Sequence, residues 1–355
     1  MQRKNLPLPS VYRQEDSRDP NFVVSDMIAL QNQALAWAKQ NGIKDIGAPG
    51  QKRIALLVID DQDCFTFPTG SLFVGGQSGT GAMDDQDRLS RFIFENLDLL
   101  WEIICTLDTH SPYQGFFPIA HIRPDGSHPD PMTNVTEEKV LTGQLLPNPA
   151  FANILNVGYE WLIKQNVYYC RELARLGRYE QTIWPYHGIL GSNGHRLAGA
   201  IDQARLFHSF ARGAPNICEG KGGNPYAECY SIFGAEIRSF HDGRPIPGTE
   251  KNTTLIKRLV ESDMVIIAGQ AKSHCLAWSI QDFLTEILTQ DSDRKIAKKV
   301  YLLEDCTSPV VVPGIVDYTK EANDAVNEFR NAGMHVVRST DPMASWPGIA
   351  QQLAA

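Results

Sequence analysis

The chain has 355 residues, of which 43% are hydrophobic and 21% charged, with a formal net charge of −8. This is the composition of a globular protein long enough to bury a core without disulfides, and its acidic balance excludes the basic face that a nucleic-acid partner needs. No run approaches the roughly 18 apolar residues that span a membrane, so we expect no membrane partner. The seven cysteines include no CxxC pair, which predicts free thiols in a reducing compartment. No apolar segment follows Lys4, and this pattern predicts a cytoplasmic location.

Residues 1–50 are predicted to form an N-terminal extension to one α/β hydrolase domain that spans 1–355. Residues 1–22 are polar and contain proline, which is typical of an arm that wraps a neighbour or frays. A helical pattern follows over 24–40 and ends at Asn41-Gly42. Such a helix docks on the main body or on another subunit, and we expect a homo-oligomer.

The next two apolar runs end in acidic residues. Residues 54–59 form a continuous apolar run before Asp60, as expected of a strand covered on both faces of a parallel sheet. A helix is predicted over 84–100, and a second strand then ends in Asp108-Thr109-His110. Residues two apart in a strand share a face, so this carboxylate and imidazole could share a metal. Taken alone, Asp60 could equally cap a turn.

Residues 111–183 depart from strand–helix alternation and are predicted to be an insertion that serves as a lid or an oligomer contact. Its first half is rich in proline, glycine and polar residues, and its second half, 151–176, predicts one long amphipathic helix or two shorter ones. His121 and His128 lie in the insertion as isolated loop histidines. Trp184-Pro185-Tyr186-His187 follows it, with His187 as a third candidate ligand.

The remaining chain returns to alternation. A strand from 216 enters a glycine-rich loop that carries Lys221. Further elements are predicted as helices over 196–210, 253–260 and 318–332 and as strands over 300–305 and 335–337.

Residues 265–275 predict a buried strand, a tight turn at Gly269, and a helix that begins near His274. Cys275 would then lie in the first turn of that helix. There the helix dipole and free backbone N–H groups lower a thiol's pKa and can bind an oxyanion. The alternative is that Cys275 is a small buried apolar residue.

Together these elements predict an α/β fold: a doubly wound three-layer sandwich with a mostly parallel sheet of five or six strands. The ends of neighbouring parallel strands meet at one edge. We therefore expect four residues to converge in one crevice: Asp60, Asp108, Lys221 and Cys275.

The motifs, in this order, resemble the nicotinamidase branch of the isochorismatase-like cysteine hydrolases. The matching segments are Leu57-Val58-Ile59-Asp60-Asp61-Gln62-Asp63-Cys64-Phe65, Asp108-Thr109-His110, Trp184-Pro185-Tyr186-His187, Lys221-Gly222-Gly223-Asn224-Pro225 with Tyr230-Ser231-Ile232-Phe233, and Gly269-Gln270-Ala271-Lys272-Ser273-His274-Cys275. The resemblance covers 54–110 and 184 to about 337, and implies the isochorismatase-like hydrolase fold.

The resemblance implies a role for each matched residue. Cys275 would be the nucleophile, Asp60 the general acid/base, and Lys221 the cation between them. Three residues would hold one divalent metal ion, zinc or alternatively iron or manganese: Asp108, His110 and His187. Phe65 and Trp184 would sandwich a pyridine ring, Tyr230 would line the pocket, and a cis peptide would precede Ala271. The backbone N–H groups of Ala271 and Cys275 are suited to hold an oxyanion.

The activity implied is hydrolysis of nicotinamide, a small-molecule amide, to nicotinate and ammonia through a cysteine thioester. Gln114 stands where many members have a second histidine after the first metal motif, Gly188 replaces a cysteine, and Cys64 replaces an acid. Gln114 and the long insertion favour an alternative, another C–N hydrolase of the superfamily with a carbamoyl or ureido substrate. A third reading is a non-enzymatic binding or scaffold protein in which Cys275 is simply buried.

Overall fold

The computed structural model describes residues 5–290 and 295–349. Its centre is a six-stranded sheet in which every neighbouring pair is parallel. In sheet order the strands are β12 (His335–Val337), β9 (Val300–Leu303), β8 (Met264–Gly269), β1 (Ile54–Ile59), β2 (Leu100–Asp108) and β7 (Asn216–Lys221). The predicted doubly wound α/β fold is confirmed.

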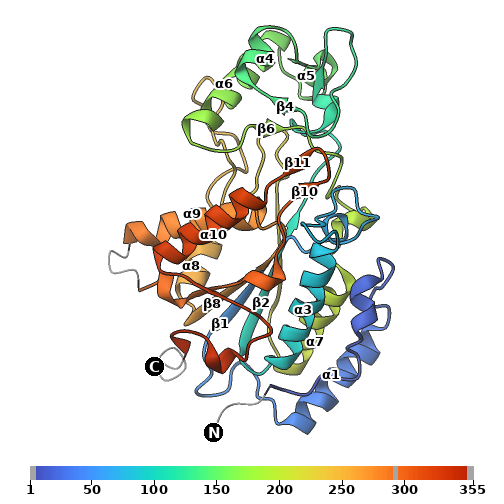
Figure 1. The fold of residues 1–355 in the computed structure, drawn as a ribbon, viewed down its shortest axis with the longest axis vertical. Coiled ribbons are helices and arrows are strands. Elements are labelled where there is room, and N and C mark those ends of the chain that lie inside the picture. The colour runs from blue at the N-terminus through green and yellow to red at the C-terminus, as the bar shows by residue number, and fades with distance from the viewer. Residues whose placement is uncertain (1–4, 291–294, 350–355) are drawn as a thin grey trace.

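Helices cover both faces of this sheet, as Figure 1 shows. One layer contains α1 (Met27–Asn41), α3 (Gly81–Glu95) and α7 (Gly199–Arg212), and the other contains α8 (Thr253–Val260), α9 (Cys275–Gln290) and α10 (Thr319–Ala332). Strand β1 is buried at every position because alternate residues face the two layers. Leu56 packs in the cluster under α1, α3 and α7, whereas Leu57 packs in the cluster under α8 and α9.

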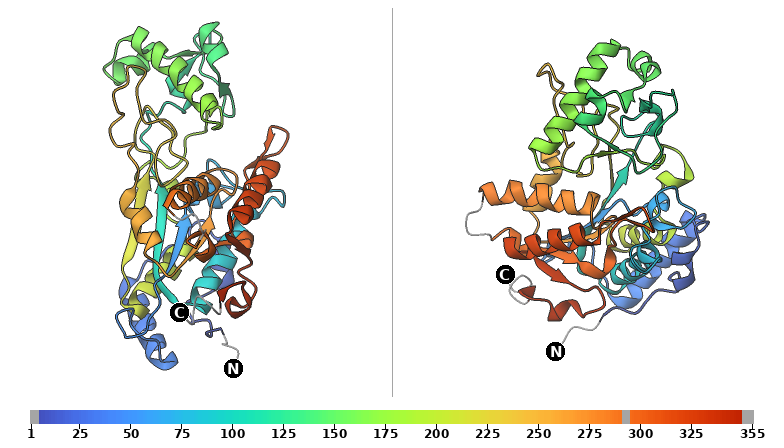
Figure 2. Two further views of the ribbon diagram at one scale, coloured as in Figure 1. Left: turned by 90° about the vertical axis from the view of Figure 1, so that its left-hand side faces the viewer. Right: turned by 45° about the horizontal axis from the view of Figure 1, so that its top comes forward.

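The segment 111–183 projects beyond the carboxyl ends of the strands (Figures 1 and 2). It contains α4 (Glu137–Leu141), α5 (Pro149–Ile154) and α6 (Tyr159–Arg175), and the short strands β3 (His121–Ile122), β4 (Asn134–Val135), β5 (Leu146–Pro147) and β6 (Gln181–Thr182). The chain returns beside the point where it left, because the N–H of His110 donates to the carbonyl of Gly188 at 2.9 Å. The excursion therefore does not disturb the sheet.

Several predicted boundaries differ from the structure. The strand predicted over 300–305 ends at Leu303, where a 3₁₀ turn begins, and the helix predicted over 196–210 spans Gly199–Arg212. The helix predicted over 84–100 ends at Glu95, where the Asn96 side chain donates to the Phe92 carbonyl, and Leu100 already belongs to β2. The prediction extended past Glu95 because the apolar residues of the turn continue the helical spacing. The stretch 151–176 forms two helices, α5 and α6, and Asn156 in the turn between them has a left-handed backbone, with φ of +54°.

The N-terminal arm packs on its own chain. The N–H of Leu6 donates to the carbonyl of Glu95, and Tyr12 contacts Phe94 edge to face. A single 3₁₀ turn, Gln14–Arg18, lies against α3 and α7. Residues 1–4 of the predicted arm lie outside the described residues. Other short elements include α2 (Asp63–Thr66) and the hairpin of β10 (Val311–Val312) and β11 (Val316–Asp317). No helix in the described ranges is long and apolar enough to cross a bilayer.

Candidate active site

The register of the parallel strands brings four strand ends to one edge. Ile59 of β1 pairs with Gly269 of β8, and Asp108 of β2 pairs with Lys221 of β7. Gly269 has φ of +109°, and a Cβ there would lie 2.1 Å from the Ile59 carbonyl oxygen. Only glycine fits this position, and it lets the turn that leads to Cys275 begin directly beside the end of β1.

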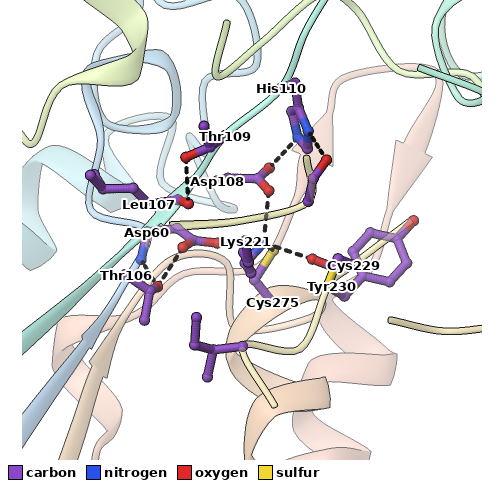
Figure 3. Close-up of polar contacts among 12 residues, drawn as sticks. Asp60, Thr106, Leu107, Asp108, Thr109, His110, Lys221, Cys229, Tyr230 and Cys275 are labelled. Atoms are coloured by element: carbon purple, nitrogen blue, oxygen red, sulfur yellow. Dashed lines mark hydrogen bonds and ion pairs between the residues drawn. The ribbon is translucent and has the colours of Figure 1, made fainter. Parts of the chain in front are cut away.

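Lys221 joins the candidate catalytic groups (Figure 3). Its Nζ lies 3.0 Å from Asp60 Oδ2, 2.8 Å from Asp108 Oδ1 and 3.5 Å from Cys275 Sγ. It also donates to the Cys229 carbonyl at 2.8 Å. Burial alone would lower the pKa of Lys221, but the Asp108 and Asp60 carboxylates outweigh it and raise that pKa well above its usual range. The lysine is therefore a permanent cation between three acidic groups.

Asp60 is completely buried and is held by the neighbouring strand. Its N–H donates to Thr106 Oγ1 at 3.0 Å, and the Thr106 hydroxyl donates back to Asp60 Oδ1. Its backbone has φ of +44°, a conformation that non-glycine residues adopt at a cost and that concentrates at functional sites. Burial raises the pKa of Asp60 despite the attraction of Lys221. This carboxyl group can therefore take up and release a proton.

Cys275 is the first residue of α9, as predicted, but its protonation differs from the expectation. Burial raises the pKa of the thiol well above its usual range; Lys221 opposes this shift, and the charges of Asp60 and Asp108 add to it. Sequence reasoning counted the helix terminus and the lysine, but neither the burial nor the two carboxylates. The resting group is thus a thiol, with Lys221 and Asp60 beside it to stabilise a thiolate and receive its proton.

The turn before Cys275 presents two free amide donors. In the described ranges, the N–H groups of Ala271 and Cys275 donate to no protein acceptor, although both residues are buried. The peptide between Gln270 and Ala271 is cis, as the resemblance implies. The Gln270 side chain fixes this turn, because its Nε2 donates to Asp85 Oδ2 at 3.0 Å and its Oε1 accepts from the Ser308 N–H at 3.2 Å. The two free donors can stabilise a negatively charged oxygen.

The three predicted metal ligands lie together and are all buried. Nε2 of His110 and Nε2 of His187 lie 2.9 Å and 3.2 Å from the same oxygen, Asp108 Oδ2. The Nδ1 atoms face the carbonyls of Gly222 and Pro185 at 2.9 Å and 2.8 Å. Carbonyls only accept, so each Nδ1 carries a proton, and each Nε2 faces the carboxylate.

This arrangement fits a divalent cation. Burial lowers the pKa of His187, which favours its neutral ring even though Asp108 opposes that shift. Nε2 of His110 has no hydrogen-bond partner although it is buried. The ligand atoms of the carboxylate and the two imidazoles converge on one point, where a cation can lie among them. Asp-His-His sets whose second ring nitrogen donates to a carbonyl are typical of zinc, iron and manganese sites.

Two glycines allow the backbone to pass close to the metal-ligand residues. Gly188 has φ of +56°, and a Cβ there would lie 2.5 Å from the Asp108 carbonyl oxygen. This explains why glycine follows His187. At Gly222, with φ of +82°, a Cβ would lie 2.6 Å from the His110 ring. Gln114 is buried beside the cluster and donates to the Gly222 carbonyl at 3.1 Å, so it supports the same carbonyl that orients His110.

The two other histidines that the sequence raised lie in segment 111–183. His121 is buried in that segment, where the His128 ring contacts its carbonyl, and neither histidine belongs to the metal-ligand cluster.

A cavity opens between the candidate catalytic and metal-ligand groups. It is lined by five of the predicted site residues: Cys275, Ala271, Asp108, His110 and His187. The three predicted substrate-binding residues, Phe65, Trp184 and Tyr230, line it too. The structure therefore brings most of the predicted site residues around one cavity, and it places Asp60 and Lys221 against Cys275.

Sequence reasoning did not identify Glu228 and His274, two further polar residues in the cavity wall. Glu228 accepts from Trp184 Nε1 at 2.8 Å, and burial raises its pKa well above the usual range, with Glu236 adding to the shift. Burial lowers the pKa of His274 to about 3. No sequence pattern pointed to either residue. Thr106, in contrast, lies two residues before Asp108, and the two-residue period of a strand would have placed it on the same face.

Comparison with known proteins gives structural matches only. No protein-family profile and no curated protein matches the chain. Solved structures that match it include the Acinetobacter baumanii nicotinamidase/pyrazinamidase (16% identity, 82% of this chain and 98% of that one, TM-score 0.48) and the yeast nicotinamidase bound to the inhibitor nicotinaldehyde (20%, 80% and 99%, 0.49). A third is the pyrazinamidase of Pyrococcus horikoshii in complex with zinc (17%, 81% and 99%, 0.42). The function of this chain is inferred below from its own site.

Proposed function

We propose that the protein is a metal-dependent nicotinamidase that hydrolyses nicotinamide to nicotinate and ammonia. The observation that carries this proposal is the position of Lys221. Its ammonium group contacts Asp60 and Cys275, and it contacts Asp108 of the metal-ligand cluster, so nucleophile, base and substrate anchor surround one cavity. A binding or scaffold protein has no need of a buried lysine between two carboxylates and a thiol.

The first half of the reaction forms a thioester. As the thiol of Cys275 attacks the carboxamide carbon, its proton passes to Asp60, and Lys221 stabilises the developing thiolate. The carbonyl oxygen becomes negative and accepts hydrogen bonds from the free N–H groups of Ala271 and Cys275. Loss of one such donor typically costs about 3 kcal/mol of transition-state stabilisation. Asp60 then returns the proton to the leaving nitrogen, the C–N bond breaks, and ammonia departs.

The second half hydrolyses the thioester. Asp60, again ionised, removes a proton from a water molecule that attacks the acyl carbon, and the same two N–H groups hold the oxyanion. The C–S bond then breaks, Cys275 regains its proton, and the carboxylate product leaves. A divalent ion held by Asp108, His110 and His187 would supply an electrophilic anchor for a ring nitrogen when bound.

The cavity suits a flat aromatic amide. Phe65 and Trp184 provide apolar ring surfaces, and Tyr230 lies at right angles to Trp184 with ring centroids 6.5 Å apart. Two aromatic walls select a planar ring, while the metal-ligand cluster and the two free N–H groups fix its two polar ends.

An ammonia-release assay with nicotinamide tests the proposal, using protein reconstituted separately with zinc, iron or manganese. We expect turnover with at least one metal, none with Cys275→Ala, and loss after chelation. Metal analysis of the native protein identifies the ion. Absence of turnover with every metal would refute the nicotinamidase proposal.

A second candidate is another C–N hydrolase with a carbamoyl or ureido substrate. Glu228 and His274 favour it, because they place a protonated carboxyl and a neutral imidazole in the cavity wall, where they can bind polar groups that nicotinamide lacks. A panel of nicotinamide, pyrazinamide and simple carbamoyl compounds separates the candidates by kcat/KM. Activity that persists in chelator, and is highest on a carbamoyl compound, would favour the second.

A further inference from the structure

A pair of thiols lies on the edge strand β7 and its neighbour β2, apart from the candidate active site. Cys105 of β2 and Cys218 of β7 are direct partners in the parallel register. Side chains of in-register partners leave the same face of a parallel pair, and neighbouring strands are about 4.8 Å apart. A disulfide accepts Cα separations of about 4.4–6.8 Å. The backbone therefore already holds the two residues within bonding range.

The two thiols differ in access. Cys105 is completely buried, whereas Cys218, on the edge strand, is exposed. Each thiol shifts the pKa of the other. An oxidant in solution thus reaches Cys218 first, with Cys105 directly behind it.

A guanidinium group beside the pair favours the reactive form of Cys218. Arg205 of α7 interacts electrostatically with both thiols, and its Nε is buried without a hydrogen-bond partner. The neighbouring Cys105 thiol, opposed by burial, lowers the pKa of Cys218 to about 7; Arg205 adds to this shift and Asp202 opposes it. Thiolates react with hydroperoxides and thiols do not, so Cys218 is activated in the way that redox-sensitive cysteines are.

We propose that Cys105 and Cys218 are a peroxide-sensitive thiol pair that closes a disulfide between β2 and β7. The Cys218 thiolate attacks one oxygen of hydrogen peroxide, the O–O bond breaks, and hydroxide leaves, so that Cys218 becomes a sulfenic acid. The Cys105 thiol then attacks the Cys218 sulfur, its proton and the sulfenic OH leave as water, and the disulfide forms. The sulfurs lose two electrons in total, and the peroxide gains them.

The disulfide would affect the active site through the two strands that it joins. Asp108 and Lys221 lie three residues beyond Cys105 and Cys218. A disulfide fixes its Cβ atoms about 3.8 Å apart, so its closure draws the two strands, already within bonding range, closer together. We therefore expect oxidation to displace Lys221 and to reduce turnover by 10-fold or more. This consequence, unlike the disulfide itself, rests on the proposed function.

The test treats the full-length protein with hydrogen peroxide at pH 7 and maps its thiols by mass spectrometry. In the wild type we expect an intramolecular Cys105–Cys218 disulfide that dithiothreitol reverses. In Cys105→Ser we expect Cys218 to stop at sulfenic acid, which dimedone traps. In Cys218→Ser we expect Cys105 to remain reduced. Cys170, buried and remote from this pair, is the internal control for general oxidation.

Three outcomes would overturn the proposal: a disulfide between two molecules, oxidation of Cys170 at the same rate as Cys218, or no dimedone adduct in Cys105→Ser. The ammonia assay is run on the same samples. A mapped disulfide with unchanged turnover would refute the coupling to Lys221 alone. Absence of turnover before oxidation would refute the proposed function and leave the thiol result intact.

Discussion

Replacing Lys221 by methionine, which keeps a similar length but removes the charge, tests the central interaction of the site. The lysine nitrogen lies 3.0 Å from Asp60 and 2.8 Å from Asp108, and the side chains of both aspartates are at most 6% exposed. Without the lysine, Asp60 is left in a buried space with no counter-charge, and Asp108 keeps only the cation of its metal-ligand cluster. Removing one partner of a buried ion pair typically costs about 3–5 kcal/mol, because the remaining charge is left uncompensated.

We therefore expect Lys221→Met to lower the free energy of unfolding by about 3–5 kcal/mol, measured by urea denaturation with tryptophan fluorescence and circular dichroism at a fixed metal concentration. Asp60→Asn in the Lys221→Met background is the matched control. It removes the uncompensated charge of Asp60 and should recover a substantial part of the loss. The ammonia assay on Lys221→Met should show kcat/KM at least about 100-fold below that of the wild type.

Two results would refute this reasoning. One is a Lys221→Met protein within about 1 kcal/mol of the wild type, since that would mean that the carboxylates are satisfied without the lysine. The other is an equal loss of stability in the single and double variants, which would assign the effect to lost packing of the lysine side chain. Stability and activity are measured independently. A Lys221→Met protein that is stable but inactive would support the catalytic role of Lys221 and refute its electrostatic contribution to stability.

Three further predictions concern other parts of the site. Burial raises the pKa of Asp85 to about 6, above about 3.9 in the unfolded chain, so its contribution to stability is complete below pH 3.9 and is lost as the pH rises through 6. In urea titrations from pH 4 to 8, the free energy of unfolding of Asp85→Asn should therefore fall by roughly 3 kcal/mol less than that of the wild type. An unchanged pH dependence would contradict this prediction. Adding zinc to metal-free protein should raise the melting temperature, but not in His110→Ala, and an equal rise in both would argue against the Asp-His-His site. Trp184→Phe keeps the aromatic wall but removes the donor to Glu228, so we expect kcat/KM to fall roughly 10-fold, in line with a hydrogen bond worth about 1.5 kcal/mol, and no change would exclude that bond from substrate positioning.

The sequence by itself determined the fold class and most of the candidate site. Alternating apolar strands and amphipathic helices are local patterns, and the uninterrupted apolar run of β1 specified a strand with both faces covered. The motif residues could be placed together because parallel strands carry their carboxyl ends to one edge. Asp108 and Lys221 thus become direct register partners, although 112 residues separate them in the chain.

Only the tertiary structure decided the electrostatics of the site and its remaining walls. The pKa of Cys275 depends on burial and on the carboxylates of Asp60 and Asp108, which sequence distance conceals, and its direction is opposite to the one predicted from the helix terminus. Glu228 and His274 enter the cavity through loops and a turn that carry no periodic signal. The pairing of Cys105 with Cys218 likewise follows from strand register, because two cysteines 113 positions apart become neighbours only when β7 aligns with β2. Local patterns specify elements, whereas charge, burial and proximity follow from their packing.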